Sequence, residues 1–247
     1  MTTLRDHEGR TYIVTGGSAG IGLGSAQALA RGGARLVVVG RDRARLDAAV
    51  ASIDGDAVAC PGDLADPSLP TIAIRTAVAN FGSIDGALIS SGGPRLGSLA
   101  TLSDDDWRHA FETTFLGVIR LMRELIPVLG ASSAIAVVLS TTVWEPIHGL
   151  AASNGLRPGL AMVLKDLADE VGPRGIRVLG LAPGRIGTER MGVLAGGQHL
   201  ERDAAVPLQR WGTPEEFGEI AAFALSQRAA YLTGTVIPVD GGLHRSL

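Results

Sequence analysis

The chain has 247 residues, of which 46% are hydrophobic and 19% are charged. This apolar content supplies a buried core and excludes a disordered chain, which could not offset the entropy lost on ordering. The formal net charge is −3 and the basic residues form no run, so the sequence lacks the Lys/Arg stripe of a nucleic-acid surface. We expect a globular protein that binds no nucleic acid.

Neither the cysteine content nor the hydropathy pattern indicates export or membrane insertion. Cys60 is the single cysteine and cannot form an internal disulfide, as expected in a reducing cytosol. Even the longest uninterrupted apolar runs, such as residues 134–139, are far shorter than the ~18 residues of a membrane-spanning helix. Residues 1–10 carry charges of both signs and lack the apolar segment of a signal peptide. We expect a cytoplasmic protein with no membrane partner.

Short Ala/Val-rich runs alternate with longer amphipathic stretches along the whole chain. Runs that are apolar throughout indicate strands buried on both faces, as in a parallel sheet. In chain order the predicted elements are strand Tyr12–Thr15, helix Gly22–Arg31, strand Arg35–Gly40, helix Asp42–Ile53, strand Asp56–Cys60, helix Leu69–Phe81, strand Ala87–Ser90, helix Asp104–Leu129, strand Ile135–Ser140, helix Leu156–Val171, strand Ile176–Ala182, helix Pro214–Leu225 and strand Thr235–Val239. This repetition predicts an α/β fold, a Rossmann-like doubly wound sheet of about seven parallel strands flanked by helices, as a single domain over residues 1–247.

A glycine-rich turn follows the first predicted strand, with the sequence Thr15-Gly16-Gly17-Ser18-Ala19-Gly20-Ile21-Gly22. Dinucleotide binding needs glycines here because the turn is tight, the backbone approaches a pyrophosphate, and the helix packs close to the strand. The helix N-terminus then offers unpaired N–H groups and a positive dipole to the anion. An ordinary tight turn would use the same glycines, but the place of this one in a β-α series favours a dinucleotide.

Five motifs in this order resemble those of the short-chain dehydrogenase/reductase family, and the resemblance covers almost the whole chain. They are Thr-Gly-x-x-x-Gly-Ile-Gly at 15–22, Gly62-Asp63-Leu64 with the family's adenine-contacting Asp, Ser90-Ser91-Gly92-Gly93 where most members have Asn-Asn-Ala-Gly, Pro183-Gly184 followed by Thr188 beside the nicotinamide, and Thr233-Gly234 with Val239-Asp240-Gly241-Gly242. Within the family the chain resembles proteins of the 3-oxoacyl-(acyl-carrier-protein) reductase type. The resemblance implies a homotetramer, with a homodimer as the alternative, and a small-molecule substrate.

The resemblance and the charge pattern together predict the residues that bind the cofactor. They are Gly16, Ser18, Ala19, Gly20, Ile21, Gly22, Arg41, Asp63, Leu64, Ser91, Gly92, Arg157, Pro183, Gly184, Ile186 and Thr188.

The end of the second strand bears on which nicotinamide cofactor is used. An acidic residue about 20 residues past the glycine turn normally accepts the ribose 2′-hydroxyl of NAD. Here Gly40 is followed by Arg41, which would pair with a 2′-phosphate, and only then by Asp42. We therefore predict NADP(H), with Ser18 and Arg43 assisting; the alternative is that Arg41 only ends the strand and Asp42 serves NAD.

The residues at the family's catalytic positions are unusual. Most members carry a serine, a tyrosine thirteen residues later that exchanges the carbonyl proton, and a lysine four residues further on that lowers the tyrosine pKa and holds the ribose. Aligned on the strand at Ile135, this chain has Ser140, Ser153 and Arg157 at these three positions. An arginine can hold a ribose hydroxyl, but it cannot act as a proton reservoir near neutral pH.

No shift of the alignment restores the missing groups. The only tyrosines are Tyr12 and Tyr231, near the first and last strands, and the only lysine is Lys165, about 12 Å along a helix from Arg157. Thr114 stands seven residues after Trp107, where the family has an asparagine. The chain therefore resembles an atypical member that lacks the catalytic tyrosine and lysine.

Three functions remain open at this stage. In the first, hydride still reaches a small, mostly apolar carbonyl or α,β-unsaturated carbonyl compound; Ser140 orients the acceptor oxygen, Arg157 holds the cofactor ribose, and Ser153 or Asn154 supplies a further hydrogen bond. In the second, the site performs a dehydration or isomerisation with His148 as the base. In the third, the chain is a catalytically silent NADP(H)-binding sensor or partner protein.

The stretch from about 186 to 208 is predicted to form a substrate lid. It contains Gly192, Gly196 and Gly197, and closing loops commonly exclude water from such chemistry. Its apolar residues Met191, Val193 and Leu194 would face a non-ionic substrate; the alternative is an ordinary amphipathic helix. The five histidines show no ligand spacing, so no metal is predicted.

Overall fold

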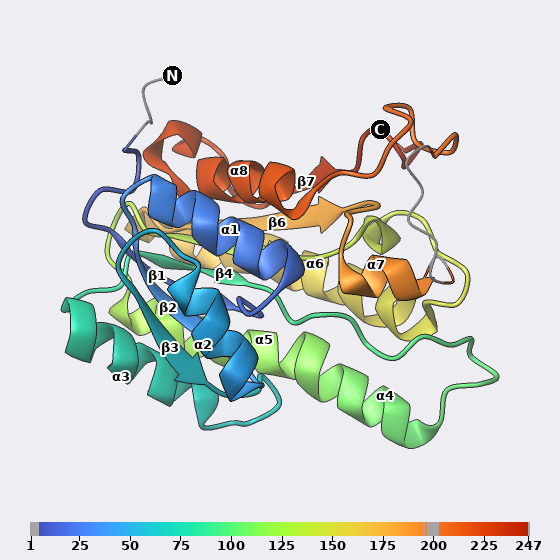
Figure 1. Cartoon of the computed structure of the whole chain (residues 1–247), viewed down its shortest axis with the longest axis horizontal. Coiled ribbons are helices and arrows are strands. Elements are labelled where there is room, and N and C mark those ends of the chain that lie inside the picture. Colours follow the sequence, from blue (N-terminus) through green and yellow to red (C-terminus); the bar gives the residue numbers. More distant parts are fainter. Residues whose placement is uncertain (1–4, 195, 197–202, 247) are drawn as a thin grey trace.

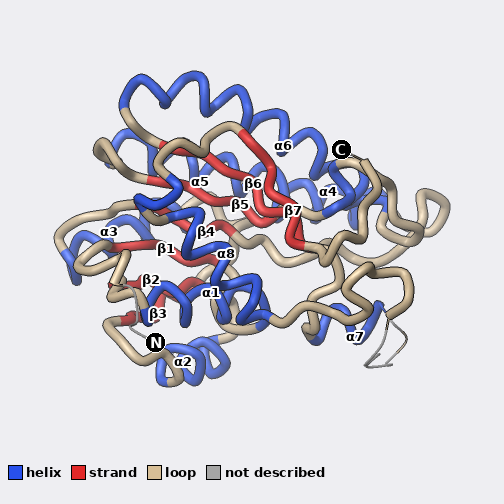
Figure 2. The backbone as a smooth tube through the Cα atoms, turned by 90° about the horizontal axis from the view of Figure 1, so that it is seen from above, coloured by secondary structure: helices blue, strands red, loops and turns tan. Residues whose placement is uncertain are grey.

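Seven strands form one sheet with helices on both of its faces (Figures 1 and 2). The computed structural model describes residues 5–194, 196 and 203–246. In chain order the elements are β1 (Thr11–Thr15), α1 (Gly20–Arg31), β2 (Arg35–Gly40), α2 (Arg43–Ala51), β3 (Ala57–Pro61), α3 (Leu69–Phe81), β4 (Gly86–Ile89), α4 (Asp104–Ala110), α5 (Gly117–Leu125), β5 (Ala134–Val138), α6 (Ala151–Val171), β6 (Arg177–Pro183), α7 (Glu189–Leu194), α8 (Pro214–Leu225) and β7 (Thr235–Val239).

The strand order is β3-β2-β1-β4-β5-β6-β7, and every neighbouring pair is parallel. This confirms the predicted doubly wound sheet. The order reverses between β1 and β4, which creates a crevice at the carboxyl ends of these strands. Thr15 joins the two ends, because its hydroxyl donates to the Ser90 carbonyl at 3.0 Å and accepts the Ser90 N–H at 2.9 Å.

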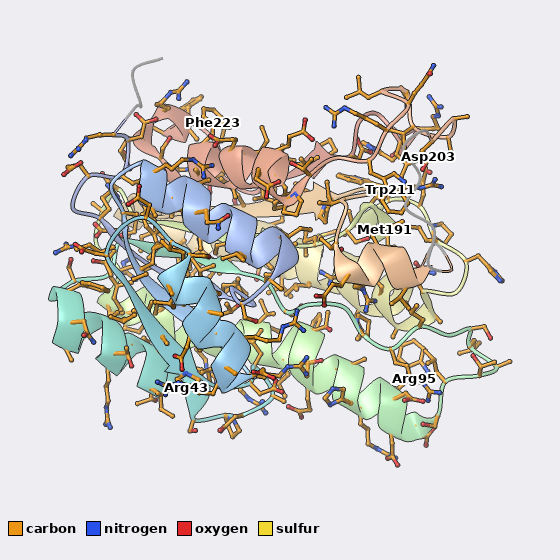
Figure 3. All side chains as sticks on the ribbon, viewed as in Figure 1. Arg43, Arg95, Met191, Asp203, Trp211 and Phe223 are labelled. Carbon is orange, nitrogen blue, oxygen red and sulfur yellow. The ribbon has the colours of Figure 1, made fainter. Side chains whose placement is uncertain are left out.

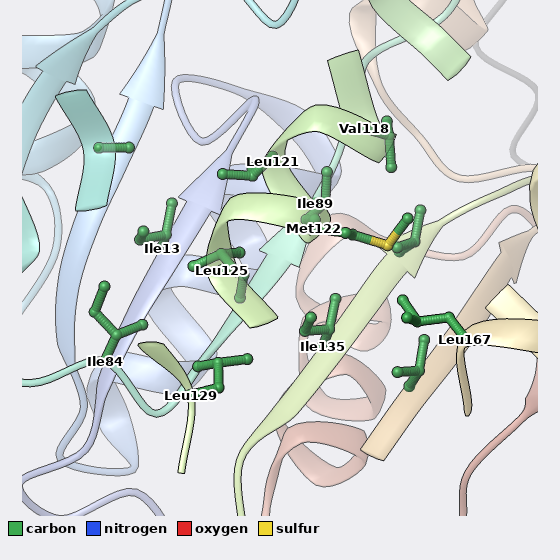
Figure 4. Packing of buried hydrophobic residues seen from close by; sticks show 14 of the residues in the cluster. Ile13, Ile84, Ile89, Val118, Leu121, Met122, Leu125, Leu129, Ile135 and Leu167 are labelled. Atoms are coloured by element: carbon green, nitrogen blue, oxygen red, sulfur yellow. The ribbon is translucent and has the colours of Figure 1, made fainter. Parts of the chain in front are cut away.

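Two hydrophobic layers hold the helices on the sheet. Alternate residues of each strand point to opposite faces, so Ile13 packs under α3, α5 and α6 while Tyr12 and Val14 pack under α1 and α8. Figure 4 shows the first layer, where Leu121 and Leu125 of α5 lie over the strands. Each fully buried aliphatic side chain stabilises the fold by about 1.5–3 kcal/mol. Among the described residues, no helix combines the length and apolarity needed to cross a membrane.

The helix predicted over Asp104–Leu129 is interrupted. Residues 111–116 form a π-helical turn between α4 and α5, and residues 126–128 end the segment as a 3₁₀ turn. Thr113 donates its hydroxyl to the His109 carbonyl at 2.8 Å, which competes with the regular helical ladder. Gly117 lies against the backbone of Leu64, where an added Cβ would meet its carbonyl oxygen at 2.2 Å. The wider turn lets the segment follow this close approach.

The predicted start of the helix at Leu156 was wrong, because α6 begins at Ala151. Residues 151–155 are small and polar, so they carry little periodic hydropathy. They become helical through tertiary packing, since Ala152 is buried against Leu102 and Ala110. The earlier start matters for function because it places Ser153 on the helix.

A buried histidine anchors the N-terminal segment to α8. The ring of His7 accepts the Tyr12 hydroxyl at Nδ1, 3.0 Å away, and donates from Nε2 to the Ala222 carbonyl at 3.1 Å. A carbonyl oxygen can only accept, so the neutral ring carries its hydrogen on Nε2. Burial lowers the pKa of His7, more than the Ala222 hydrogen bond and the charge of Asp6 raise it.

This environment predicts acid destabilisation. The unfolded chain binds a proton at His7 near pH 6.5 while the folded chain resists it, so the free energy of unfolding should fall as the pH drops below about 6.5. We expect the slope of that free energy against pH to be shallower in His7→Gln between pH 6.5 and 5, whatever its absolute stability. Urea titration across this range measures the slope. His109→Gln, at an exposed position on α4, serves as the control, and equal slopes in all three proteins would contradict the prediction.

Candidate active site

A cavity of about 1030 Å³ opens at the carboxyl ends of the central strands, where the strand order reverses. Its walls come from the β1–α1 turn, the segments after β4, β5 and β6, the start of α6, α7 and residues 243–244. Figure 3 shows Met191 of α7 and Trp211, which both line it, near each other at this end of the molecule. The predicted site residues in its lining are Gly16, Ala19, Gly20, Ile21, Gly22, Gly92, Ser140, Ser153, Arg157, Pro183, Gly184, Ile186 and Thr188.

The glycine turn has the geometry that a phosphate cradle needs. Gly16 adopts φ +62°, and an added Cβ at Gly22 would lie 2.1 Å from the Gly16 carbonyl oxygen. Helix α1 begins after Ala19, which makes no side-chain cap, and its first turn contains no acidic residue. Its first N–H groups therefore remain available to an anion, and the residues of the turn fit a dinucleotide pyrophosphate.

Five predicted cofactor residues lie outside the cavity lining: Ser18, Arg41, Asp63, Leu64 and Ser91. Arg41 and Asp63 follow β2 and β3, and their side chains form a loose ion pair, with Nη1 of Arg41 3.7 Å from Oδ2 of Asp63. The Arg41 side chain is 73% exposed. Leu64 is buried in the core, so only its backbone is available to a ligand.

The two residues that follow Arg41, which were also considered for cofactor binding, have other partners. Asp42 is the N-cap of α2, where its carboxylate accepts the Arg45 N–H at 2.9 Å. Arg43 pairs with Asp47 one helical turn later, at 2.8 Å. A carboxylate engaged as a helix cap is a poor partner for a ribose hydroxyl, whereas Arg41 is exposed and makes only the loose ion pair with Asp63 among the described residues.

Ser140 and Ser153 bring two hydroxyl groups to the part of the cavity that we call its floor, and the Thr142 hydroxyl lies against that of Ser153. The Ser140 hydroxyl oxygen accepts the Thr142 N–H at 3.2 Å, and the Thr142 and Ser153 hydroxyls are 3.2 Å apart. Ser140 and Ser153 line the cavity, and Ser153 is almost fully buried. Because the oxygen of Ser140 is the acceptor in its own turn, its hydrogen is free to point at a ligand.

Arg157 is buried beneath these hydroxyls. Its Nη1 donates to the Val138 carbonyl and its Nη2 to the Gly92 carbonyl, both at 2.7 Å. Burial, with a smaller effect of the nearby Arg190 charge, lowers the pKa of Arg157 to about 10. The guanidinium is still a cation at neutral pH, and among the described residues it has no carboxylate partner. It joins the ends of β4 and β5 and adds positive charge to the site.

The structure describes residues 186–194, 196 and 203–208 of the predicted lid, and α7 within them brings an unexpected charge into the cavity. Arg190 donates to the Gly93 carbonyl at 3.0 Å and to the Pro94 carbonyl at 2.8 Å, while Glu189 pairs with Arg45 of α2 at 2.9 Å. Met191 lines the cavity as predicted, but Val193 is exposed. The inner face is therefore not uniformly apolar. The predicted lid residue Gly197 and the side chain of Leu194 lie outside the described part of the chain.

Asn154 and His148 have different surroundings from those expected. The Asn154 amide accepts the Ile147 N–H at 3.1 Å and donates to the Ile147 carbonyl at 2.9 Å, so it secures residues 144–150 to α6 and does not line the cavity. This corrects its predicted role as a donor to the substrate. His148 lines the cavity but is exposed.

Both tyrosines and the lysine lie away from the cavity. Tyr12 is buried in the core, Tyr231 is fully exposed, and Lys165 is exposed on α6 next to Gly234. Thr114, in the π-helical turn, has a buried hydroxyl with no hydrogen-bond partner in the described structure. None of these residues lines the cavity.

Sequence reasoning missed the C-terminal wall of the cavity. Leu243 and His244, the two residues that follow the last recognised motif, line the cavity, as does Glu145. A single histidine near a chain end carries no periodic signal, so only the folded structure reveals its place. Arg190 was also missed, because the lid was predicted from its glycines and apolar residues.

Comparisons with known proteins support this geometry. A family model described as enoyl-(acyl carrier protein) reductase matches residues 16–244. The 3-oxoacyl-(acyl-carrier-protein) reductase FabG of Chlamydia muridarum is 33% identical, with 95% of this chain and 97% of that protein covered. The peroxisomal 2,4-dienoyl-CoA reductase SPS19 of Saccharomyces cerevisiae is 31% identical, with 96% of this chain and 84% of that protein covered.

Solved structures at similar identity share the whole fold. L-sorbose reductase from Gluconobacter frateurii, complexed with NADPH and L-sorbose, superposes with a TM-score of 0.90 at 28% identity, and the match covers 100% of both chains. A short-chain oxidoreductase from Pseudomonas aeruginosa PAO1, described as containing an atypical catalytic center, superposes with a TM-score of 0.88 at 28% identity, covering 96% of this chain and 98% of that one.

The contact between Gly93 and Arg190 yields a prediction. A Cβ added at Gly93 would lie 1.9 Å from Cζ of Arg190, so Gly93→Ala should displace this flexible side chain and break both of its hydrogen bonds. Hydrogen bonds from charged donors contribute about 1.5–3 kcal/mol, which corresponds to amide exchange about tenfold or more faster in α7. Hydrogen exchange read by mass spectrometry measures this. Gly130→Ala, with open space at its Cβ, is the control, and unchanged exchange in α7 would contradict the prediction.

Proposed function

The chain belongs to the short-chain dehydrogenase/reductase family of nicotinamide-dependent oxidoreductases, and on this premise we propose that it is an NADP(H)-dependent reductase. Its proposed substrate is a small, mostly apolar carbonyl compound, with an α,β-unsaturated carbonyl favoured. The observation that carries the proposal is a cavity lined by the glycine turn and by Ser153 and Arg157, which stand at the positions where the resemblance puts the family's tyrosine and lysine. We infer that this is an atypical member that works without a tyrosine acid.

The cofactor end supports NADP(H). The bare N-terminus of α1 suits a pyrophosphate, and the exposed guanidinium of Arg41 suits a 2′-phosphate. Asp42, the alternative partner for a ribose hydroxyl, is engaged as the N-cap of α2. The sorbose reductase of the same fold binds NADPH, which supports this choice. A nicotinamide bound here would supply hydride, that is, two electrons and one hydrogen nucleus.

The hydroxyl groups of the floor determine which acceptor is favoured. Reduction of a ketone produces an alkoxide, which needs a matched acid at the oxygen, and losing such an acid costs about 10²–10⁴ in rate. Conjugate reduction of an enone produces an enolate, a weaker base that hydrogen bonds alone stabilise. The Ser140 and Ser153 hydroxyls would hold that oxygen, and the buried charge of Arg157 would lower its energy further.

The known relatives span both reactions. One is named for the reduction of a dienoyl thioester and another for the reduction of a 3-oxoacyl thioester. Reduction of C=C bonds and reduction of C=O bonds are therefore both named among relatives of this chain. The structural neighbour with an atypical catalytic center supports departures from the usual residues within this fold. The non-redox function gains no support from the geometry, because the exposed His148 lacks a side chain that would orient it among the described residues. Turnover distinguishes a silent binding protein from a reductase.

We also propose that the chain assembles as a homotetramer. Exposed apolar side chains lie on the long central helices, with Met162 of α6 70% exposed and Phe111, between α4 and α5, 41% exposed. Strand β7 is an edge of the sheet with one side unpaired. These surfaces are the ones that the family resemblance assigns to subunit contacts.

Matched substrates test the proposed reaction. With NADPH, we expect kcat/KM for 2-cyclohexenone to exceed that for cyclohexanone by about 100-fold or more, because only the ketone needs the missing acid. NADPH absorbance and product analysis measure this. Reduction of cyclohexanone without reduction of the C=C bond of 2-cyclohexenone would contradict the proposed conjugate reduction. NADPH binding with no turnover of either compound would instead support the silent protein.

The cofactor preference has its own test. Arg41→Ala should raise the Kd of NADPH about tenfold, equivalent to the loss of about 1.4 kcal/mol, and should leave the Kd of NADH nearly unchanged. Fluorescence titration measures both constants. Arg75→Ala, at an exposed position on α3, is the control. An equal loss for the two cofactors, or no loss, would contradict the assignment of Arg41 to the 2′-phosphate.

A further inference from the structure

The C-terminal turn carries a paired histidine and aspartate that close one wall of the cavity. Nδ1 of His244 lies 2.6 Å from Oδ2 of Asp240, and the same oxygen accepts the His244 backbone N–H at 3.0 Å. The Asp240 side chain is 5% exposed and that of His244 is 14% exposed. One oxygen of the buried Asp240 carboxylate thus contacts both the ring and the backbone nitrogen of His244, which gives the ring a defined orientation.

The aspartate determines which ring nitrogen carries a proton. Burial raises the pKa of Asp240, but hydrogen bonds from the backbone and ring of His244 and from the Gly242 N–H together lower it below its usual value. The carboxylate is ionised and can only accept, so Nδ1 of His244 must donate to it. Nε2 is then the nitrogen that gains and loses a proton, and within the described residues it has no hydrogen-bond partner.

Aromatic stacking holds the same ring against the active-site segment. The rings of His244 and Trp144 stack at 4.6 Å between centroids, with 14° between their planes. The backbone N–H of Arg245 also donates to the Glu145 carboxylate at 2.8 Å. Trp144 follows Ser140 after a single 3₁₀ turn, and His244 and Ser140 both line the cavity.

We propose that His244, oriented by Asp240, is the proton donor of this cavity and delivers its proton to the α-carbon of the substrate. The inference rests on the proposed conjugate reduction. Ser140 and Ser153 hold the oxygen at the floor, while His244 lines the C-terminal wall of the same cavity. The two functions of the absent tyrosine, holding the oxygen and supplying the proton, are thereby divided between two walls.

The step balances without any further reactant. Hydride adds to the β-carbon, and the electron pair of the C=C bond moves to form the enolate. The proton then leaves Nε2 of the His244 imidazolium and forms the C–H bond at the α-carbon, which restores the C=O bond. The substrate has gained two electrons and two hydrogen nuclei, the nicotinamide has been oxidised, and the neutral ring regains its proton from water.

His148, the other described histidine of the cavity, is a weaker candidate. It is exposed, and no carboxylate or aromatic ring holds it in the described structure. A mobile imidazole can accept protons from water, but it cannot present one face of its ring to a fixed carbon atom. Stereochemistry therefore separates His244 from protonation by solvent or by a loosely held group.

The experiment uses the full chain, NADPH and 2-methyl-2-cyclohexenone, whose reduction creates a stereocentre at the α-carbon. The wild-type protein should give one stereoisomer at that carbon when products are analysed at early times. His244→Gln should lower kcat about 100-fold, with KM and the Kd of NADPH changed less than about threefold, and should give nearly equal amounts of both stereoisomers. His109→Gln is the control for an exposed histidine outside the cavity.

A second variant guards against a purely structural effect. His244→Ala leaves a space next to Trp144 in which free imidazole can bind, so added imidazole should restore part of the lost kcat. A ring that only held the turn in place would not be replaced by a soluble imidazole in this way. Asp240→Asn should lower kcat with NADPH binding retained, because it removes the charge that orients the ring.

Three results would overturn the inference. The wild-type rate and a single stereoisomer in His244→Gln would exclude His244 while leaving the proposed reductase intact. A loss of rate in His148→Gln with His244→Gln unaffected would transfer the role to the exposed histidine. A wild-type protein that binds NADPH but never oxidises it with the enone would remove the proposed function itself, and the inference with it.

Discussion

A buried guanidinium joins the two strand ends on which the candidate site is built. Arg157 reaches from α6 to the Val138 carbonyl after β5 and to the Gly92 carbonyl after β4. Burying this charge without a carboxylate partner is costly, and its lowered pKa, about 10, reflects that cost. The site therefore has a rigid, positively charged floor at the switch point of the sheet. Such a floor stabilises developing negative charge, but a guanidinium does not release protons near neutral pH.

The rest of the site follows from this constraint. Ser140 and Ser153 line the same cavity as the buried charge of Arg157. A titratable ring with a fixed tautomer stands on another wall, where His244 is held by Asp240 and Trp144. Separating the group that holds the oxygen from the group that moves the proton suits an enolate, in which the charge and the protonated carbon are different atoms. A single phenol suits an alkoxide, in which they coincide.

The sequence analysis did not predict that α7 brings a positive charge to the cavity. Three apolar residues predicted a nonpolar lid, yet Arg190 lies among them and ties α7 to the segment after β4. Val193 instead faces solvent. The apolar surface that remains, including Met191 and Trp211, is consistent with a small substrate that has one polar group. Arg190 also lowers the pKa of Arg157, although burial lowers it more.

The sequence alone determined the sheet, its helices and the phosphate turn, because each depends on neighbouring residues. The seven apolar runs correspond to strands within a residue or two, and the steric need for glycine at Gly16 and Gly22 is local. Helix boundaries were less certain, since the start of α6 is stabilised by tertiary packing and carries little hydropathy signal of its own.

Only the tertiary structure decided which side chains are free to act. Asn154 and Asp42 were plausible ligands by position, but a backbone amide or a helix end already occupies each of them. His244 lies far along the chain from Ser140, yet both line one cavity. A hydrogen-bonding group has few partners, and folding brings competing partners from distant segments. The sequence shows which groups could act, and only the fold shows which of them are still uncommitted.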